Sequence, residues 1–276
     1  MKSSLIRLYN AYKNDGLLST ASQSIRYGCR YSLHWLGKAG LYSTPRYQTL
    51  LQRLNGGPFS KYVDPFTIIF IDPSEIKYIT TRGPNPGRFK WQDIGSVEGG
   101  SWDQSEDRFG DLPVAKALRD RFEGGKAWEE IDFIQDVIRL ADRGIVRWRG
   151  CRTEADVMDA CAEIDALYEQ IKIDGYRSKK ELVEAGACSP DIWDVDGFNQ
   201  YDEVLVDIGR DGQFLFVDGR HRLTIAKILE IDKIPVRVSA RHAAWQELRE
   251  EIAETEPSAL PEHLKQYLEH PDISAS

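Results

Sequence analysis

The sequence predicts an α+β fold, and three segments of the 276-residue chain indicate it. Residues 214–238 have the pattern of a strand, a glycine turn, a helix and a second strand. Residues 157–171 place apolar side chains at helical spacing, whereas residues 66–71 form an apolar run of the length of one strand. A chain of this length can bury a sizeable core, so we expect one large domain, alone or with appendages.

The first half of the chain begins with helical patterning and continues into an irregular section. Leu5, Leu8, Tyr9 and Tyr12 fall on one helical face, which predicts mainly helical structure over residues 3–54. The elements expected next are a turn at 55–58, the strand at 66–71, an irregular section from about 80 to 110, and helices over 114–122 and 129–142.

The second half is divided by caps and turns. Thr153 and Asp156 are spaced as a capping box at a helix N-terminus, and Gly175 is typical of a helix C-terminus. Gly209-Arg-Asp-Gly212, between two apolar runs, predicts a hairpin. The elements expected after it are the strand–turn–helix–strand unit at 214–238, a helix from 241–242 to about 252, and a short helix over 261–268.

The glycine turn carries a resemblance to a known superfamily. Val217-Asp-Gly-Arg-His-Arg222, followed by a helix and by Ile234-Pro-Val-Arg-Val238, resembles the ParB/sulfiredoxin-like superfamily. In that superfamily a strand, a Gly-x-x-Arg turn, a helix and a closing strand hold nucleotide phosphates. Of the turns of ParB, sulfiredoxin and the free serine kinase, that of the free serine kinase, Asp-Gly-His-His-Arg, is the most similar. Residues 67–76, 163–175 and 203–208 resemble the first strand, first core helix and next strand of such domains.

The resemblance implies an α+β, ParB/sulfiredoxin-like domain over residues 59–252, with a small mixed sheet and packed helices. A basic, aromatic-rich helical extension would precede it at residues 1–58, and a short helix with a tail would follow at 253–276. A long insertion at about 80–150 has no counterpart. Arg220 stands where sulfiredoxin has its reactive cysteine, and Arg-His-Arg replaces the Glu-Arg-Arg of ParB, so the nucleobase stays open.

The turn combines a helix N-terminus with basic side chains, which together favour anion binding. The first N–H groups of a helix have no intrahelical partner and carry partial positive charge. Gly219, Arg220, His221 and Arg222 are therefore predicted to hold phosphates, and Asp218 to bind a metal or orient an acceptor hydroxyl. The resemblance implies Mg²⁺ with ATP or ADP. The alternatives are a charged helix end without a ligand and, for the histidine, a core-facing ring bonded to a carbonyl.

Further site residues are expected outside the turn. The resemblance implies a glutamate after the first strand, for which Glu75 is the nearest match. Asp103 is a second candidate base, and Trp102 beside it offers a stacking surface; the alternative is an acidic solvated loop. Arg241 and His242 could bind a second anionic group of the substrate, or simply decorate a helix end. The segments Trp128-Glu-Glu130 and Arg147-Trp-Arg149 are more typical of packing.

The charges are distributed unevenly. Residues 1–61 contain nine Lys or Arg and one acid, a net charge of +8, so the remainder carries −16 of the total of −8. A basic, aromatic segment can contact a membrane surface, a nucleic-acid backbone, a protein partner, or the acidic remainder of its own chain. The acidic remainder argues against a protein that grips DNA with its main surface.

The other compositional features are those of a cytoplasmic protein. The sequence has no apolar run of membrane-spanning length and no secretory signal at its N-terminus, so we expect no transmembrane segment and a cytoplasmic, possible membrane-peripheral location. Four cysteines, Cys29, Cys151, Cys161 and Cys188, show no C-x-x-C pair, which argues against a zinc site or a disulfide framework.

The sequence thus predicts a nucleotide-dependent phosphotransferase, a kinase acting on a small hydroxylated metabolite. The alternative is a non-enzymatic, ParB-like nucleotide switch or adaptor that binds DNA or a protein partner. A third reading is a degenerate fold whose turn binds nothing.

Overall fold

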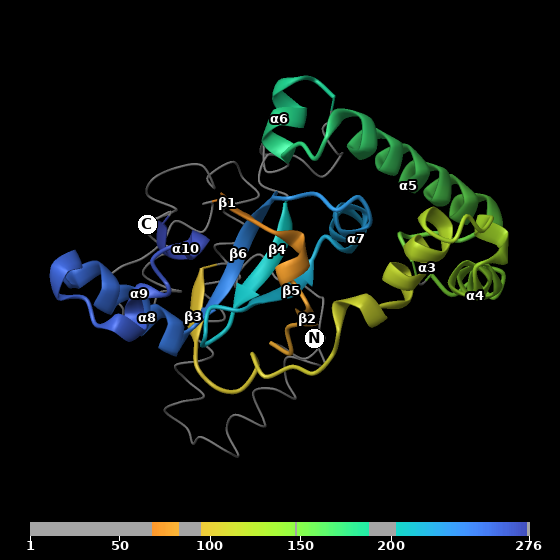
Figure 1. The fold of residues 1–276 in the computed structure, drawn as a ribbon. Helices are drawn as coiled ribbons and strands as arrows, with labels where there is room; N and C mark the ends of the chain where they lie inside the picture. The colour runs from red at the N-terminus through yellow and green to blue at the C-terminus, as the bar shows by residue number, and fades with distance from the viewer. Residues whose placement is uncertain (1–67, 83–94, 147, 188–202, 275–276) are drawn as a thin grey trace, which may run out of the picture.

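The structure is a computed structural model that describes residues 68–82, 95–146, 148–187 and 203–274. Within these ranges the chain forms a six-stranded mixed sheet and eight α-helices, which confirms the α+β class (Figure 1). The expected extension at residues 1–58 lies outside the described residues. None of the helices in these ranges is long and apolar enough to cross a membrane.

The sheet is mixed and is built around β6, its longest strand. The order is β1-β6-β4-β5-β2, and β3 also pairs with β6. β6 runs parallel to β4 and β3 and antiparallel to β1, whereas β5 is antiparallel to β4 and parallel to β2. The strands are β1 (Ile68–Ile71), β2 (Tyr78–Ile79), β3 (Ser96–Glu98), β4 (Val204–Ile208), β5 (Phe214–Asp218) and β6 (Ile234–His242).

The helices fall into three groups along the chain (Figure 1). The first group covers α3 (Pro113–Phe122), α4 (Asp132–Ala141), α5 (Glu154–Asp174) and α6 (Lys179–Glu184). α7 (Arg220–Ile228) connects β5 to β6, and α8 (Ala243–Glu254), α9 (Glu262–Lys265) and α10 (Pro271–Ser274) follow β6. Short 3₁₀ turns lie at 73–75, 109–111, 128–130 and 257–259.

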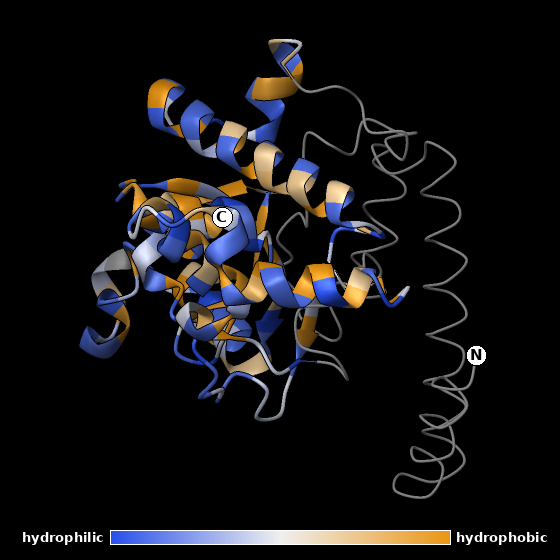
Figure 2. Ribbon diagram, turned by 90° about the vertical axis from the view of Figure 1, so that its right-hand side faces the viewer, coloured by the Kyte–Doolittle hydropathy of each residue, from blue (hydrophilic) through white to orange (hydrophobic). Residues whose placement is uncertain are grey.

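Local sequence accounts for the bounds of the longest helix. Thr153 accepts a hydrogen bond from the Asp156 N–H at 3.1 Å, and Asp156 in turn accepts from the Thr153 N–H at 3.1 Å, which forms the predicted capping box. Gly175, with φ of +78°, ends the helix as predicted. Figure 2 shows the helices banded with hydrophobic and hydrophilic residues, as expected for helices with one buried side.

α7 lies between the sheet and a helical lobe made of α3, α4 and α5. Its Leu223 and Ala226 belong to the core formed with the strands. Ile225 belongs to a second core, which includes Trp128, Ile134 and Ile164 of the lobe. α7 therefore packs against both the sheet and the lobe.

Two details differ from the expectations. The irregular section from about 80 to 110 contains β3, whose three residues pair with the end of β6. Arg241 and His242 belong to β6 rather than to the following helix, which begins at Ala243. Both differences have one cause, which is the pairing of β3 with the end of β6. This pairing makes Arg241 and His242 part of the strand, although their local sequence would suit the start of a helix equally well.

Candidate functional site

Gly219 fixes the geometry of the turn between β5 and α7. It is the N-cap of α7 in the left-handed region, with φ of +92° and ψ of +29°. A Cβ at this position would lie 2.9 Å from the Cα atom of Val204 in β4. Both the conformation and the close approach therefore require glycine, and they start α7 directly against the sheet.

Arg222 is held in a network that braces the fold. Its guanidinium donates to the Glu203 carboxylate at 2.9 Å and to the Arg177 carbonyl at 2.6 Å, and it lies 4.5 Å from the centre of the Tyr176 ring. The side chain of Glu203 is fully buried. Because these contacts use the donors of Arg222, we assign it to the connection between α7, β4 and the α5–α6 link.

Arg220 and His221 differ from Arg222 in their surroundings. The Arg220 guanidinium has no hydrogen bond or ion pair with any residue in the described ranges, although its carbonyl accepts from Thr224 at 2.7 Å. His221 points to the lobe, where its ring lies 6.0 Å from that of Trp148. Burial, followed by the charges of Arg149 and Arg220, lowers the pKa of His221 to about 4. His221 is therefore neutral at pH 7 and offers a hydrogen bond rather than a positive charge.

Asp218 ends β5 and stands before the helix. Its Oδ1 accepts from the Gly219 N–H at 2.8 Å. The described residues contain no group of three or more His, Cys, Asp or Glu side chains that could hold a metal ion by themselves. Mg²⁺ is commonly bound through one or two carboxylates together with substrate phosphates, so a single aspartate fits an ion that arrives with a nucleotide.

Asp103 lies at the opposite end of β5 from Asp218. Its carboxylate accepts from the Arg210 side chain at 2.7 and 2.8 Å and from the Arg210 backbone N–H at 2.9 Å. Arg210 belongs to the hairpin before β5, and the five residues of that strand span about 13 Å. Burial raises the pKa of Asp103, but the hydrogen bonds from Arg210 outweigh it and lower the pKa to about 2. Such a carboxylate is a weak base.

Arg241 is enclosed in a cluster of buried charges. It donates to both oxygens of Asp272 at 2.9 and 2.6 Å, and Trp245 donates its indole N–H to the same carboxylate at 2.9 Å. Arg249 lies 3.1 Å from Asp272 as well. Burial alone would raise the pKa of Asp272, but the two arginines and the Trp245 N–H outweigh this effect, so that the net shift of the pKa is downward.

His242 caps a helix and is placed beside Trp102. Its Nδ1 accepts from the Ala244 N–H at 3.1 Å, which leaves Nε2 to donate to the Gly100 carbonyl at 3.0 Å. The Trp102 ring lies 5.7 Å away, and its N–H donates to the Glu98 carbonyl at 3.3 Å. Of the three predicted substrate-binding residues, Trp102 and His242 therefore lie together, while Arg241 pairs with Asp272.

Glu75 lies near the other end of α7. It ends the 3₁₀ turn at 73–75, is exposed, and has a raised pKa because of partial burial and then of repulsion from Asp72. α7 has nine residues and is about 13 Å long, and this turn packs against its C-terminal half. Glu75 is therefore separated from Gly219 by much of the helix.

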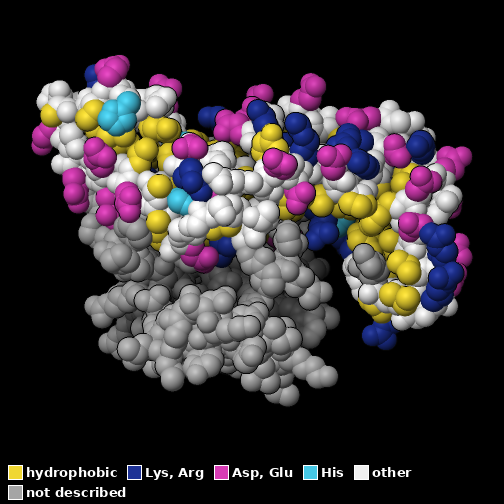
Figure 3. All heavy atoms as spheres, turned by 90° about the horizontal axis from the view of Figure 1, so that it is seen from below, with side chains coloured by type: hydrophobic (Ala, Val, Ile, Leu, Met, Phe, Trp, Pro, Cys, Tyr) yellow, Lys and Arg dark blue, Asp and Glu magenta, His cyan; other side chains and the backbone are white. Residues whose placement is uncertain are grey.

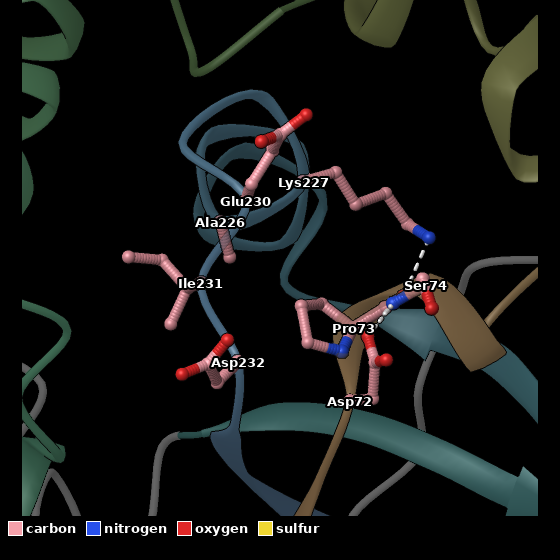
Figure 4. Close-up of a pocket in the computed structure, with 8 residues that line it drawn as sticks. All are labelled: Asp72, Pro73, Ser74, Ala226, Lys227, Glu230, Ile231 and Asp232. Atoms are coloured by element: carbon pink, nitrogen blue, oxygen red, sulfur yellow. Dashed lines mark hydrogen bonds between the residues drawn. The ribbon is translucent and has the colours of Figure 1, made fainter.

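A pocket of about 460 Å³ occupies the space beside this turn (Figure 4). Lys227 of α7 reaches across it and donates to the Pro73 carbonyl, as Figure 4 shows. Burial lowers the pKa of Lys227 to about 8, against a small opposing effect of Asp72. The pocket is lined by Asp72, Pro73, Ser74, Ala226, Lys227, Glu230, Ile231 and Asp232, none of which belongs to the glycine turn.

The lobe contributes two residues that the sequence analysis assigned to packing. Trp148 and Arg149 belong to the turn between α4 and α5, and both act on His221, Trp148 through a ring contact and Arg149 through its charge. Their signal in the sequence is a tryptophan flanked by arginines and followed by a glycine, but nothing local connects it to residue 221. On the lobe, Figure 3 shows basic side chains beside hydrophobic ones.

Comparisons with protein-family models, with curated proteins and with solved structures return no match.

Proposed function

We propose that the protein is a nucleotide-dependent phosphotransferase with a ParB/sulfiredoxin-like domain, which acts on a small hydroxylated metabolite. One observation carries the proposal: the N-terminus of α7 combines unpaired first-turn N–H groups with the Arg220 guanidinium, which has no partner among the described residues. The resemblance of the turn to nucleotide-binding domains supplies the ligand, ATP or ADP.

In this proposal the residues of the turn have separate roles. The N–H groups of α7 and Arg220 bind phosphate oxygens, and Gly219 lets the backbone approach them closely. Asp218 would hold Mg²⁺, which when bound neutralises charge on the phosphates, and the same carboxylate orients the acceptor hydroxyl. Arg222 keeps the helix start in place through Glu203.

A second candidate function is a nucleotide-dependent switch or adaptor that binds DNA or a protein partner without chemistry. It is favoured by the placement of the other predicted catalytic and substrate-binding residues. Asp103 and Arg241 are held in ion pairs away from the turn, with Arg210 and Asp272 respectively. Asp218 is the only carboxylate among residues 218–222, so the turn itself has no second acid that could serve as a base.

Nucleotide binding can be tested by thermal unfolding with ATP, ADP, CTP and GTP, each with and without Mg²⁺. We expect a magnesium-dependent rise in Tm with an adenine nucleotide, lost in Arg220→Ala and kept in Arg139→Ala, whose exposed side chain lies on α4. Arg220 is the better probe of the turn than Arg222, because removing Arg222 disturbs the fold. No shift with any nucleotide at millimolar concentration would overturn both candidate functions.

Turnover separates the two candidates. For a phosphotransferase, Asp218→Asn should abolish nucleotide consumption in the presence of an acceptor while nucleotide binding largely survives. Nucleotide binding without consumption across a panel of hydroxylated metabolites would favour the switch, and DNA retention that weakens with salt would identify its partner.

A further inference from the structure

Trp148 is an exception among the tryptophans that the structure describes. Trp102, Trp128 and Trp245 each donate the indole N–H to an oxygen, at 3.3, 3.0 and 2.9 Å respectively. Trp148 is only 6% exposed, yet its buried Nε1 has no hydrogen-bond partner within the described part of the chain. A buried N–H without an acceptor is costly, so an unpaired donor at a fixed place indicates a missing oxygen.

His221, whose ring is next to that of Trp148, has the same feature. Its Nε2 is buried and has no hydrogen-bond partner among residues in the described ranges, and its ring centre lies 6.0 Å from that of Trp148. His221 is the second residue of α7, so the two rings lie beside the first turn of this helix. Two unpaired nitrogens on neighbouring rings can both donate to the oxygens of one acceptor group.

The charged groups that act on His221 most strongly are positive. Arg149 from the lobe and Arg220 from α7 both lower its pKa, in addition to its burial. Arg149 pairs with Glu163 of α5, but that pair is at the surface, with side chains 37% and 66% exposed. Exposed pairs of this kind contribute little, so Arg149 can exchange Glu163 for a more highly charged partner.

The backbone of the turn brings Arg149 to this position. Arg149 and Gly150 have φ of +48° and +80°, and the Cys151 N–H donates to the Trp148 carbonyl at 2.9 Å. Two consecutive residues with positive φ make a tight turn, which arginine adopts at some cost. Trp148 and Arg149 are consecutive residues of this turn, and both act on His221, the first through its ring and the second through its charge.

We propose that Trp148 and Arg149 form the second wall of the anion site at the N-terminus of α7. The indole N–H and the guanidinium contact oxygens of the phosphate chain from the side opposite to Gly219 and Arg220. This inference rests on the proposed function, and it gives the helical lobe a part in ligand binding.

The indole N–H of Trp148 can be observed directly. In a ¹H–¹⁵N correlation spectrum of the full chain, the peak absent from Trp148→Phe identifies this tryptophan among the seven in the sequence. We expect that peak to move when ATP–Mg²⁺ or inorganic pyrophosphate is added, because its N–H gains an acceptor. The peaks of Trp128 and Trp245, assigned in the same way, should stay in place, since each already has a carboxylate acceptor.

Arg149→Gln supplies a test that leaves the core untouched. We expect it to weaken ATP or pyrophosphate binding by about tenfold, as for the loss of one charge-assisted hydrogen bond. Arg139→Gln, an exposed arginine on α4, should bind as the wild type does.

The outcomes separate this inference from the proposed function. If nucleotide binds, but the Trp148 peak does not move and Arg149→Gln binds with wild-type affinity, the second wall is refuted and the proposed function still stands. If pyrophosphate binds and moves the peak but no nucleotide binds, Trp148 and Arg149 do contact phosphate, and the proposal that the ligand is a nucleotide is refuted. If neither probe binds, both proposals fail.

Discussion

Asp103 should stabilise the fold by an amount that depends on pH, and Asp103→Asn measures it. The pKa of Asp103 falls from its ordinary value of 3.8 to about 2 in the folded protein. Each pH unit of difference corresponds to ~1.4 kcal/mol, so the ionised carboxylate contributes on the order of 2 kcal/mol. Since Asp103 is only 3% exposed, little of this is lost to solvent screening.

The sign follows from the direction of the shift. A depressed folded pKa stabilises the protein fully above the unfolded pKa near 4, and the contribution is lost as the pH falls towards 2. By this relation roughly half of it should be gone at pH 3. We expect urea unfolding to show a wild-type advantage over Asp103→Asn that is about 1 kcal/mol smaller at pH 3 than at pH 5.

Asp136→Asn provides the matched control, because Asp136 is an exposed carboxylate on α4 in a surface pair with Arg139. Its difference from the wild type should stay within a few tenths of a kcal/mol at both pH values. An Asp103→Asn difference that is equal at pH 3 and pH 5 would refute the reasoning, since Asp103 would then not be held ionised by Arg210.

Two further predictions concern the turn itself. Arg222→Ala should lower the free energy of unfolding by about 3 kcal/mol, measured in urea, because the buried Glu203 carboxylate loses its charge partner; a loss below about 1 kcal/mol would show that the brace is unimportant. Gly219→Ala should cost at least about 2 kcal/mol, whereas Gly144→Ala, at a helix end with φ of +74° and no atom within 4 Å of its Cβ, should cost about 1–2 kcal/mol; equal losses would exclude a contribution from contact with Val204.

The parts of the fold that could be predicted from the sequence are those set by neighbours in the chain. The capping box at Thr153, the helix end at Gly175 and the turn at Gly219 are each specified by a few consecutive residues, and the structure confirms them. The strand β3 could not be predicted in this way. Its three residues are a strand because they pair with residues 240–242 of β6, far away in sequence.

The candidate site likewise has one part that the local sequence predicts and another part that depends on residues far away in the chain. Sequence alone placed Asp218, Gly219 and Arg220 at a helix start, since they are consecutive. It could not show that Arg222 pairs with Glu203, or that Asp103 pairs with Arg210 at a separation of 107 residues. An arginine that binds phosphate and one that braces a buried carboxylate have the same local sequence, and only the fold distinguishes them.

The carboxylate of Asp272 has a consequence for the order in which the molecule can be completed. It pairs with Arg241 of β6 and with Arg249 of α8 and accepts from the Trp245 N–H, and these residues precede it by 31, 23 and 27 positions. During synthesis the sheet residues and both arginines emerge before residue 272 exists, so their positive charges cannot be buried at that stage. We therefore expect β6, the last strand of the sheet, to pack stably only after α10 has been made. A nascent chain that ends at Glu254 should remain sensitive to proteolysis at β6.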